Sequence, residues 1–118
     1  MTQAANAPMH TREVFEFLKR CAGQMRTVHY DEISKNAGGF APRGIGKILG
    51  YIRDDICRPR GLPWLSVIAV GKNSWIPGDD YFGMPVLEGV DRPTQERIWR
   101  GMVLQVFAYD WSRVEIDN

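Results

Sequence analysis

HYDEISKNAGGFAPRGIGKILGYI, residues 29–52, is the stretch on which the interpretation of the whole chain depends. Its first part predicts a short helix, EISKNA, that Asp31 can cap and that Gly38-Gly39 stops, since glycine commonly ends helices. A second helix is expected to begin around Pro42, because proline is tolerated in the first helical turn. Two helices joined by a sharp glycine turn are typical of a helix-turn-helix.

The second of these helices has two different sides. One is an apolar stripe with the spacing i, i+3, i+4, i+7 and i+11, which indicates an amphipathic helix that packs on a core. Its members are Ile45, Ile48, Leu49, Ile52 and Ile56. Arg43, Lys47 and Tyr51 are expected together on another side. Each glycine of RGIGKILG, residues 43–50, weakens the helix by roughly 1 kcal/mol relative to alanine, so we expect another backbone to approach closely there.

The flanking sequence predicts further elements. A helix is expected from Thr11, whose hydroxyl can cap it, to CAGQ at residues 21–24, and RTVHY at residues 26–30 predicts a brief extended segment. WLSVIAV, residues 64–70, is β-branched and apolar and predicts a buried strand. The turn GKNS and the dipeptide WI would return this strand as a β-hairpin.

A last helix is expected over residues 90–110. Asp91 is a candidate cap, and Pro93 and Thr94 open the helix. Its predicted apolar face consists of Ile98, Trp99, Met102, Val103, Val106 and Phe107. This face is too regular for a solvated tail, so we expect the helix to pack back on the body.

The order of elements therefore predicts a mainly α fold with a small β-hairpin. We interpret it as a winged helix-turn-helix with an added C-terminal helix. Residues 1–10 are expected to be a disordered tail, and residues 11–118 a single domain, of which residues 79–118 are an acidic C-terminal extension. The chain has 118 residues, enough for one core and too few for two.

Charge is distributed unevenly along the chain. Residues 1–78 hold 11 Lys and Arg against 6 Asp and Glu, a net +5, whereas residues 79–118 hold 4 against 8, a net −4. Such asymmetry suggests that one face of the body meets an anion, although scattered surface charge is an alternative. No apolar run approaches the length of a membrane span, and the N-terminus does not read as a secretory signal. Cys21 is expected to be a buried, reduced thiol, which favours a cytoplasmic protein.

Two strings carry a family resemblance. VHYDEISKNAGGFAPRGIGKIL and LPWLSVIAVGKNSWIPG together resemble the DNA-binding domain of the O6-alkylguanine-DNA alkyltransferases and of the alkyltransferase-like proteins. The resemblance covers roughly residues 13–78, with an extra stretch before Pro63. It implies that Tyr30 contacts the phosphate of a rotated nucleotide. It also implies that Arg43 enters the duplex and fills the space left by a flipped base.

The same resemblance bears on catalysis. Pro63-Trp64 matches the Pro-Cys of the methyltransferases, and the alkyltransferase-like proteins also have tryptophan in place of that cysteine. Leu65-Ser66 replaces the His-Arg that follows, so there is neither a nucleophile nor a histidine to activate one. We therefore expect no enzyme activity, no catalytic residues and no cofactor. His10 and His29 have no metal-ligand spacing with either cysteine, so no metal site is expected.

These observations leave two classes of function open. The first is a non-catalytic protein that binds duplex DNA, including a modified or flipped base. The predicted contact residues are Tyr30, Arg43, Lys47, Arg58, Arg60, Trp64 and Lys72. For Tyr30 and Trp64, packing in the core is an equal or stronger alternative. The second class is a protein-interaction or regulatory module that reuses the winged-helix fold. In that class residues 79–118 dock a partner, or form a homodimer through Trp99 and Trp111.

Overall fold

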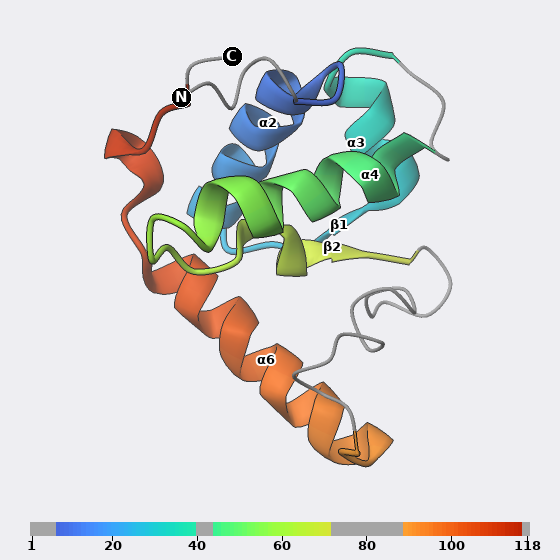
Figure 1. Cartoon of the computed structure of the whole chain (residues 1–118), viewed down its shortest axis with the longest axis vertical. Helices are drawn as coiled ribbons and strands as arrows, with labels where there is room; N and C mark the ends of the chain where they lie inside the picture. The colour runs from blue at the N-terminus through green and yellow to red at the C-terminus, as the bar shows by residue number, and fades with distance from the viewer. Residues whose placement is uncertain (1–6, 40–43, 72–88, 117–118) are drawn as a thin grey trace.

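The computed structural model describes residues 7–39, 44–71 and 89–116. Its α-helices are α2 (Thr11–Gly23), α3 (Tyr30–Asn36), α4 (Ile45–Tyr51) and α6 (Arg92–Ala108). The π-helix η2 (Ile52–Cys57) continues α4, and η3 (Leu65–Ile68) and η5 (Trp111–Arg113) are 3₁₀-helices. Two short strands, β1 (Val28–His29) and β2 (Ala69–Val70), form a small sheet. This arrangement confirms the predicted mainly α class (Figure 1).

Helix α2 supplies one wall of the core, as its apolar spacing predicts. The buried residues of this helix are Thr11, Val14, Phe15, Phe17, Leu18, Cys21 and Ala22. The predicted capping role of Thr11 is wrong, because Thr11 is the first helical residue and His10 occupies the N-cap position, where its side chain makes no capping hydrogen bond. The Thr11 hydroxyl instead donates to the carbonyl oxygen of Pro8, which satisfies that hydroxyl where it is buried.

Helix α3 begins one residue earlier than its predicted cap. His29 is the N-cap, and Asp31 lies inside the first turn. There its negative charge interacts favourably with the positive end of the helix dipole, but it does not cap the helix. The predicted stop at the glycine pair is confirmed. Gly38 and Gly39 have φ values of 134° and 71°, and the amide of Gly39 donates to the carbonyl of Ser34. These left-handed values end the helix and redirect the chain toward α4.

The isoleucine stripe of α4 and η2 packs on the core as predicted. Ile45, Ile48, Ile52 and Ile56 are buried, and Leu49 is partly buried against them. Tyr51 was predicted beside Lys47, but its side chain is only 8% exposed and belongs to the core. The structure describes no residue before Gly44 in this helix, so the predicted start at Pro42 lies outside the described residues.

The expectation that another backbone approaches the glycines of this helix is wrong at Gly44 and Gly50. A Cβ atom added at either position would meet no atom within 4 Å. Glycine at position 50 therefore adds to the backbone entropy lost on folding, and no close packing at this position offsets that loss.

We expect Gly50→Ala to raise the free energy of unfolding by about 1 kcal/mol, because alanine has the higher helix propensity and nothing obstructs its methyl group. Urea denaturation of the two proteins measures this difference. Gly38→Ala is the contrasting control, because its Cβ would collide with the imidazole of His10 at a φ of 134°. Stabilisation by Gly38→Ala, or destabilisation by Gly50→Ala, would contradict the conclusion that position 50 has room for a methyl group and position 38 does not.

The segment 64–70 is buried as predicted, but it is not a seven-residue strand. Its first part is the 3₁₀-helix η3, and the strand β2 is limited to Ala69 and Val70. A continuous apolar run does not distinguish a strand from a buried helical turn, and here η3 packs against α2, α6 and η2. Strand β2 pairs in parallel with β1, Val28 opposite Ala69. The predicted return strand at residues 75–76 lies outside the described residues.

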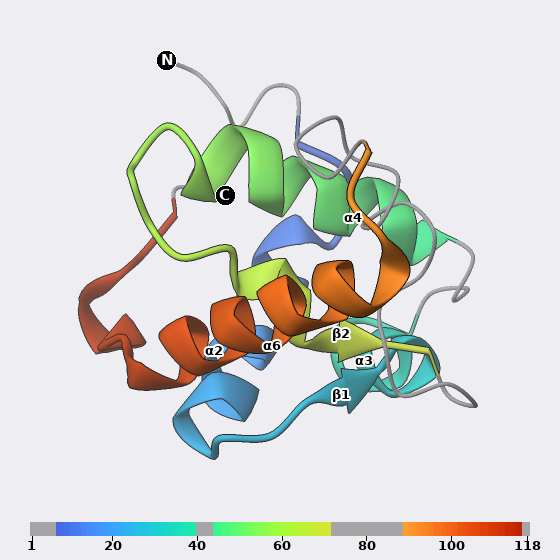
Figure 2. The same cartoon turned by 90° about the horizontal axis from the view of Figure 1, so that it is seen from below.

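Helix α6 packs back on the body, as predicted. The side chain of Asp91 accepts a hydrogen bond from the amide of Thr94, which confirms the predicted cap. Trp99, Val103 and Val106 are buried, and the indole Nε1 of Trp99 donates to the carbonyl of Val67 at 2.7 Å. Figure 2 shows α6 crossing the molecule on the side of the two strands, away from α4.

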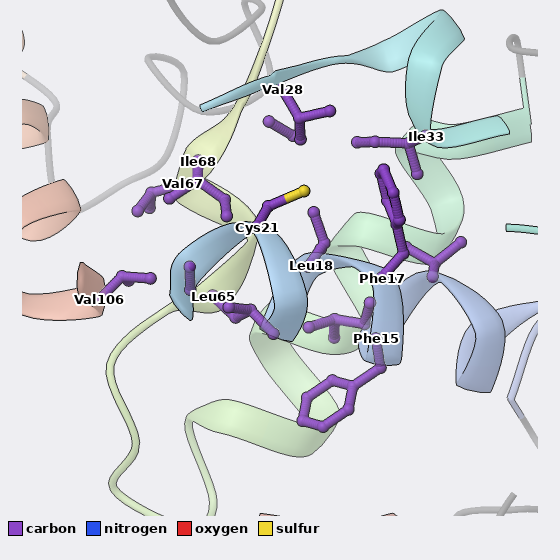
Figure 3. Close-up of a cluster of buried hydrophobic side chains, with 14 of the residues drawn as sticks. Phe15, Phe17, Leu18, Cys21, Val28, Ile33, Leu65, Val67, Ile68 and Val106 are labelled. Carbon is purple, nitrogen blue, oxygen red and sulfur yellow. The ribbon is translucent and has the colours of Figure 1, made fainter. Parts of the chain in front are cut away.

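One core joins all of these elements. Figure 3 shows α2 side chains among residues of β1, α3, η3 and α6, with the sulfur of Cys21 inside the cluster. Cys21 is 1% exposed and is a free thiol, as predicted. Within the described ranges, no helix is both long and apolar enough to span a bilayer.

Candidate nucleic-acid interface

The helix pair α3–α4 carries two of the predicted contact residues. Tyr30 opens α3 directly after β1 and is half-buried against the core. Lys47 is exposed on α4, and Ile45 and Ile48 on the same helix are buried. The apolar stripe therefore holds α4 in place while Lys47 projects away from the body.

Lys35 is a cation of this region that the sequence argument missed. It is exposed in the last turn of α3, shortly before the glycine turn. Its position near the end of α3 suits the helix dipole, which is a sufficient structural reason for a lysine there. Lys35 could have been identified from the sequence, because it lies three residues before Gly38, in the last turn of the predicted helix.

The remaining described contact residues lie at the other end of the helix. Arg58 and Arg60 belong to the loop that follows η2, which Figure 1 shows at the opposite end of the α4–η2 helix from α3. The guanidinium carbon of Arg58 lies 5.9 Å from the ring centroid of Trp64, a cation–π contact. The same guanidinium is 3.6 Å from a carboxylate oxygen of Asp54.

Asp54 offsets part of the positive charge at this end. It also accepts two hydrogen bonds from Arg53, one from Nε at 2.8 Å and one from Nη2 at 2.9 Å. The hydrogen bond from Arg53 lowers the pKa of Asp54, so its carboxylate stays charged at neutral pH. The loop cations are therefore less free to meet an anion than Lys47 is.

Arg60 is tied to the C-terminal segment. Its Nη1 atom donates to the carbonyl oxygen of Glu115 at 2.8 Å. Lys19 on α2 similarly donates to the carbonyl of Val114 at 2.5 Å. These bonds join residues that are 55 and 95 positions apart, so local sequence patterns do not reveal them.

Trp64 is half-buried immediately before η3 and packs against the core, which agrees with its interpretation as a packed aromatic residue. One side of its ring is already close to Arg58. Two predicted contact residues, Arg43 and Lys72, lie outside the described residues. The structure places Tyr30 on α3 and Lys47 on α4, and it places Arg58, Arg60 and Trp64 at the other end of α4–η2.

The cysteine thiols are poorly suited to nucleophilic chemistry. Burial raises the pKa of Cys57 to about 11, although the backbone hydrogen bond of Leu65 and the charge of Arg60 act in the opposite direction. Burial also raises the pKa of Cys21. Both thiols are therefore protonated at neutral pH, and both are enclosed by the core.

The predicted dimer contact through Trp99 and Trp111 is wrong for this fold. Trp99 is 7% and Trp111 is 5% exposed, and the indole of Trp111 donates to the carbonyl of Val106. The Trp111 ring also packs edge-on against Phe15 at 6.4 Å. Both indoles are used inside the protein and are not available to a partner.

The acidic residues predicted to characterise residues 79–118 are not spread evenly along this segment. Helix α6 itself holds three arginines, Arg92, Arg97 and Arg100, against one acid, Glu96. The acidic excess comes from residues on either side of this helix.

Among the described residues, no group of three or more His, Cys, Asp or Glu side chains could hold a metal ion. No protein-family model, curated protein or solved structure matches the chain.

Proposed function

We propose that this chain is a non-catalytic DNA-binding protein of the winged helix-turn-helix, alkyltransferase-like type, and that α3 and α4 form its duplex contact. The observation that carries the proposal is the two-sided construction of α4. Its isoleucine stripe is buried, and Lys47 on the same helix is exposed just after the glycine turn. A rigidly anchored helix with an outward cation suits contact with DNA phosphates.

The small sheet supports the resemblance on which the finer assignment rests. The two strings that resemble the alkyltransferases are distant in sequence, yet β1 belongs to the first and β2 to the second. Their parallel pairing places Val28 beside Ala69 and His29 beside Val70. The resemblance assigns Tyr30 and Arg43 to DNA contact. In sequence, Tyr30 comes directly after β1 and Arg43 comes after α3.

The cysteines support the non-catalytic part of the proposal. Trp64-Leu65-Ser66 stands where the methyltransferases have the reactive cysteine and its histidine. Both thiols of the chain have raised pKa values and are buried, so neither substitutes for that nucleophile. Binding without chemistry is the function that this set of residues supports.

Lys47→Ala is expected to weaken duplex binding and to lower the slope of log K against log salt by roughly 0.9, because one phosphate contact is lost. Arg43→Ala is expected to weaken binding more, since an arginine that fills a vacated base position also supports flipping. Fluorescence anisotropy with a labelled duplex at several salt concentrations measures both effects. Plain and O6-methylguanine duplexes are compared in the same series.

Arg113→Ala is the matched control. Arg113 is exposed on η5, in the C-terminal segment. Its loss removes the same charge as the test variants and should leave the salt slope nearly unchanged. If all three variants reduce the slope equally, binding follows net charge and not α3–α4. If the parent protein does not bind at low salt, the DNA proposal fails.

The protein-interaction module is the second candidate function. It is favoured by the exposed side chains of Ile98 and Leu104 on α6, which are 40% and 67% exposed. The anisotropy experiment separates the two candidates, because an interaction module has no reason to bind duplex DNA with a salt slope that depends on Lys47.

A further inference from the structure

His10, the residue before α2, has a backbone conformation that its own helix does not explain. Its φ is 73° and its ψ is 8°, which places a non-glycine residue in the left-handed region. Such a backbone is strained, and it persists only where the surrounding structure holds it. An N-cap side chain commonly accepts a hydrogen bond from an amide of the first turn, but the imidazole of His10 makes no capping bond. The ring is therefore not used to start α2.

The imidazole instead packs on the glycine turn that ends α3. A Cβ atom added at Gly38 would come within 3.2 Å of three ring atoms of His10, namely Nδ1, Cε1 and Cγ. The ring therefore occupies the space that a side chain at position 38 would need. Figure 1 shows the dark blue start of the described chain close to the turquoise end of α3. The φ of 134° at Gly38 already favours glycine, so the ring is a second, independent reason for glycine there.

This contact connects the turn to α2, the helix that supplies one wall of the core. The side chain of His10 is 26% exposed, and its Nδ1 atom lies 4.0 Å from a carboxylate oxygen of Glu13 on α2. The next residue of the turn, Gly39, donates its amide to the carbonyl of Ser34 at 2.9 Å, and α4 begins shortly afterwards at Ile45. A turn that is fixed to α2 limits how the end of α3 and the start of α4 move relative to the core.

We propose that His10 is a positioning residue for the duplex contact: its imidazole fixes the glycine turn, so that the exposed cations Lys35 and Lys47 are held in one arrangement. The proposal rests on the DNA-binding function proposed above. His10 acts through Gly38 and is not itself assigned a contact with DNA. Without the ring, the turn samples other conformations, and only the fraction with the correct arrangement binds. The apparent dissociation constant rises in proportion as this fraction falls.

A double-mutant cycle in urea tests the contact itself, without DNA. His10→Asn removes the ring and keeps a residue that tolerates the left-handed backbone. In this background the methyl group of Gly38→Ala no longer meets the imidazole, and only the strain of its φ remains. The effect of Gly38→Ala on the unfolding equilibrium constant should therefore be about tenfold smaller than in the parent, a coupling typical of residues in contact. A cap added by the asparagine cancels, because it is present on both sides of that arm of the cycle.

Fluorescence anisotropy with the labelled duplex tests the positioning role. His10→Asn should raise the dissociation constant about fivefold at every salt concentration, because the binding-competent fraction falls. The slope of log K against log salt should stay unchanged, since no phosphate contact is removed, whereas Lys47→Ala lowers it. Met9→Asn is the matched control, because Met9 is the neighbouring residue and is 80% exposed. It should leave both quantities unchanged.

The possible outcomes separate this proposal from the DNA proposal. If the parent binds and His10→Asn binds equally well, the ring only stabilises the fold, and the positioning role is overturned while the DNA proposal stands. A lower salt slope for His10→Asn would mean that the imidazole itself meets a phosphate, which also overturns that role. Additive effects in the double-mutant cycle would show that the ring does not hold Gly38. If the parent does not bind, both proposals fail, and the cycle still reports on the contact between His10 and Gly38.

Discussion

Trp99→Ala is expected to lower the free energy of unfolding by about 3–5 kcal/mol, the largest stability effect among the changes considered. Trp99 is 7% exposed and anchors α6 to the body. Its loss leaves a cavity as large as an indole, and it also leaves the Val67 carbonyl without the 2.7 Å hydrogen bond from Nε1. Urea denaturation followed by circular dichroism measures the change.

Two variants separate the causes of this loss. Trp99→Phe keeps an aromatic ring at the site but removes the hydrogen bond, so its effect should be intermediate. Arg113→Ala, an exposed substitution, should stay within about 0.5 kcal/mol of the parent. A loss below about 1 kcal/mol for Trp99→Ala would mean that α6 contributes little to the stability of the fold.

The helices were largely predictable because their patterns are local. The spacing of Ile45, Ile48 and Ile52 specifies which side of α4 is buried, and Asp91 specifies where α6 begins. Both signals depend only on neighbouring residues, and the structure confirms both. The glycine pair that ends α3 was predictable for the same reason, since a left-handed conformation at that position favours glycine.

Residues 64–70 show where local reasoning fails. Their β-branched composition predicts a strand, yet η3 occupies the first part because α2, α6 and η2 surround it. A segment enclosed on several sides buries its side chains in either conformation, so composition does not decide between them. The parallel pairing of β2 with β1 joins segments that are distant in sequence, and no residue pattern within either two-residue strand predicts it.

The candidate interface was predictable only in part. Placing Lys47 opposite the isoleucine stripe requires no more than helical periodicity, and the structure agrees. The separation of Arg58 and Arg60 from α3 depends on the length of the α4–η2 helix between them. The bond from Arg60 to Glu115 depends on how the chain's end folds back, which no local pattern encodes.

Burial is the chief reason why the pKa of the Cys57 thiol is raised from 9.0 to about 11. Below pH 9 its thiolate fraction in the folded protein is therefore about 100-fold smaller than in the unfolded chain. We expect thiol reagents to modify Cys57 at pH 8 only after denaturation. Incubation with methylated duplex DNA should likewise leave the protein's mass unchanged. A methyl group on Cys21 or Cys57 would contradict the non-catalytic proposal.

The same shift makes stability depend on pH in a defined direction. Between about pH 9 and pH 11 the unfolded chain loses the Cys57 proton while the folded protein keeps it, so the free energy of unfolding falls as pH rises. The full difference corresponds to about 3 kcal/mol, present below pH 9 and lost above pH 11. Cys21 and Tyr51, whose pKa values are also raised by burial, act in the same direction. Cys57→Ala should therefore reduce this alkaline slope without abolishing it. A variant that keeps the parent's whole slope would show that the thiol is ionised in the folded protein as readily as in the unfolded chain.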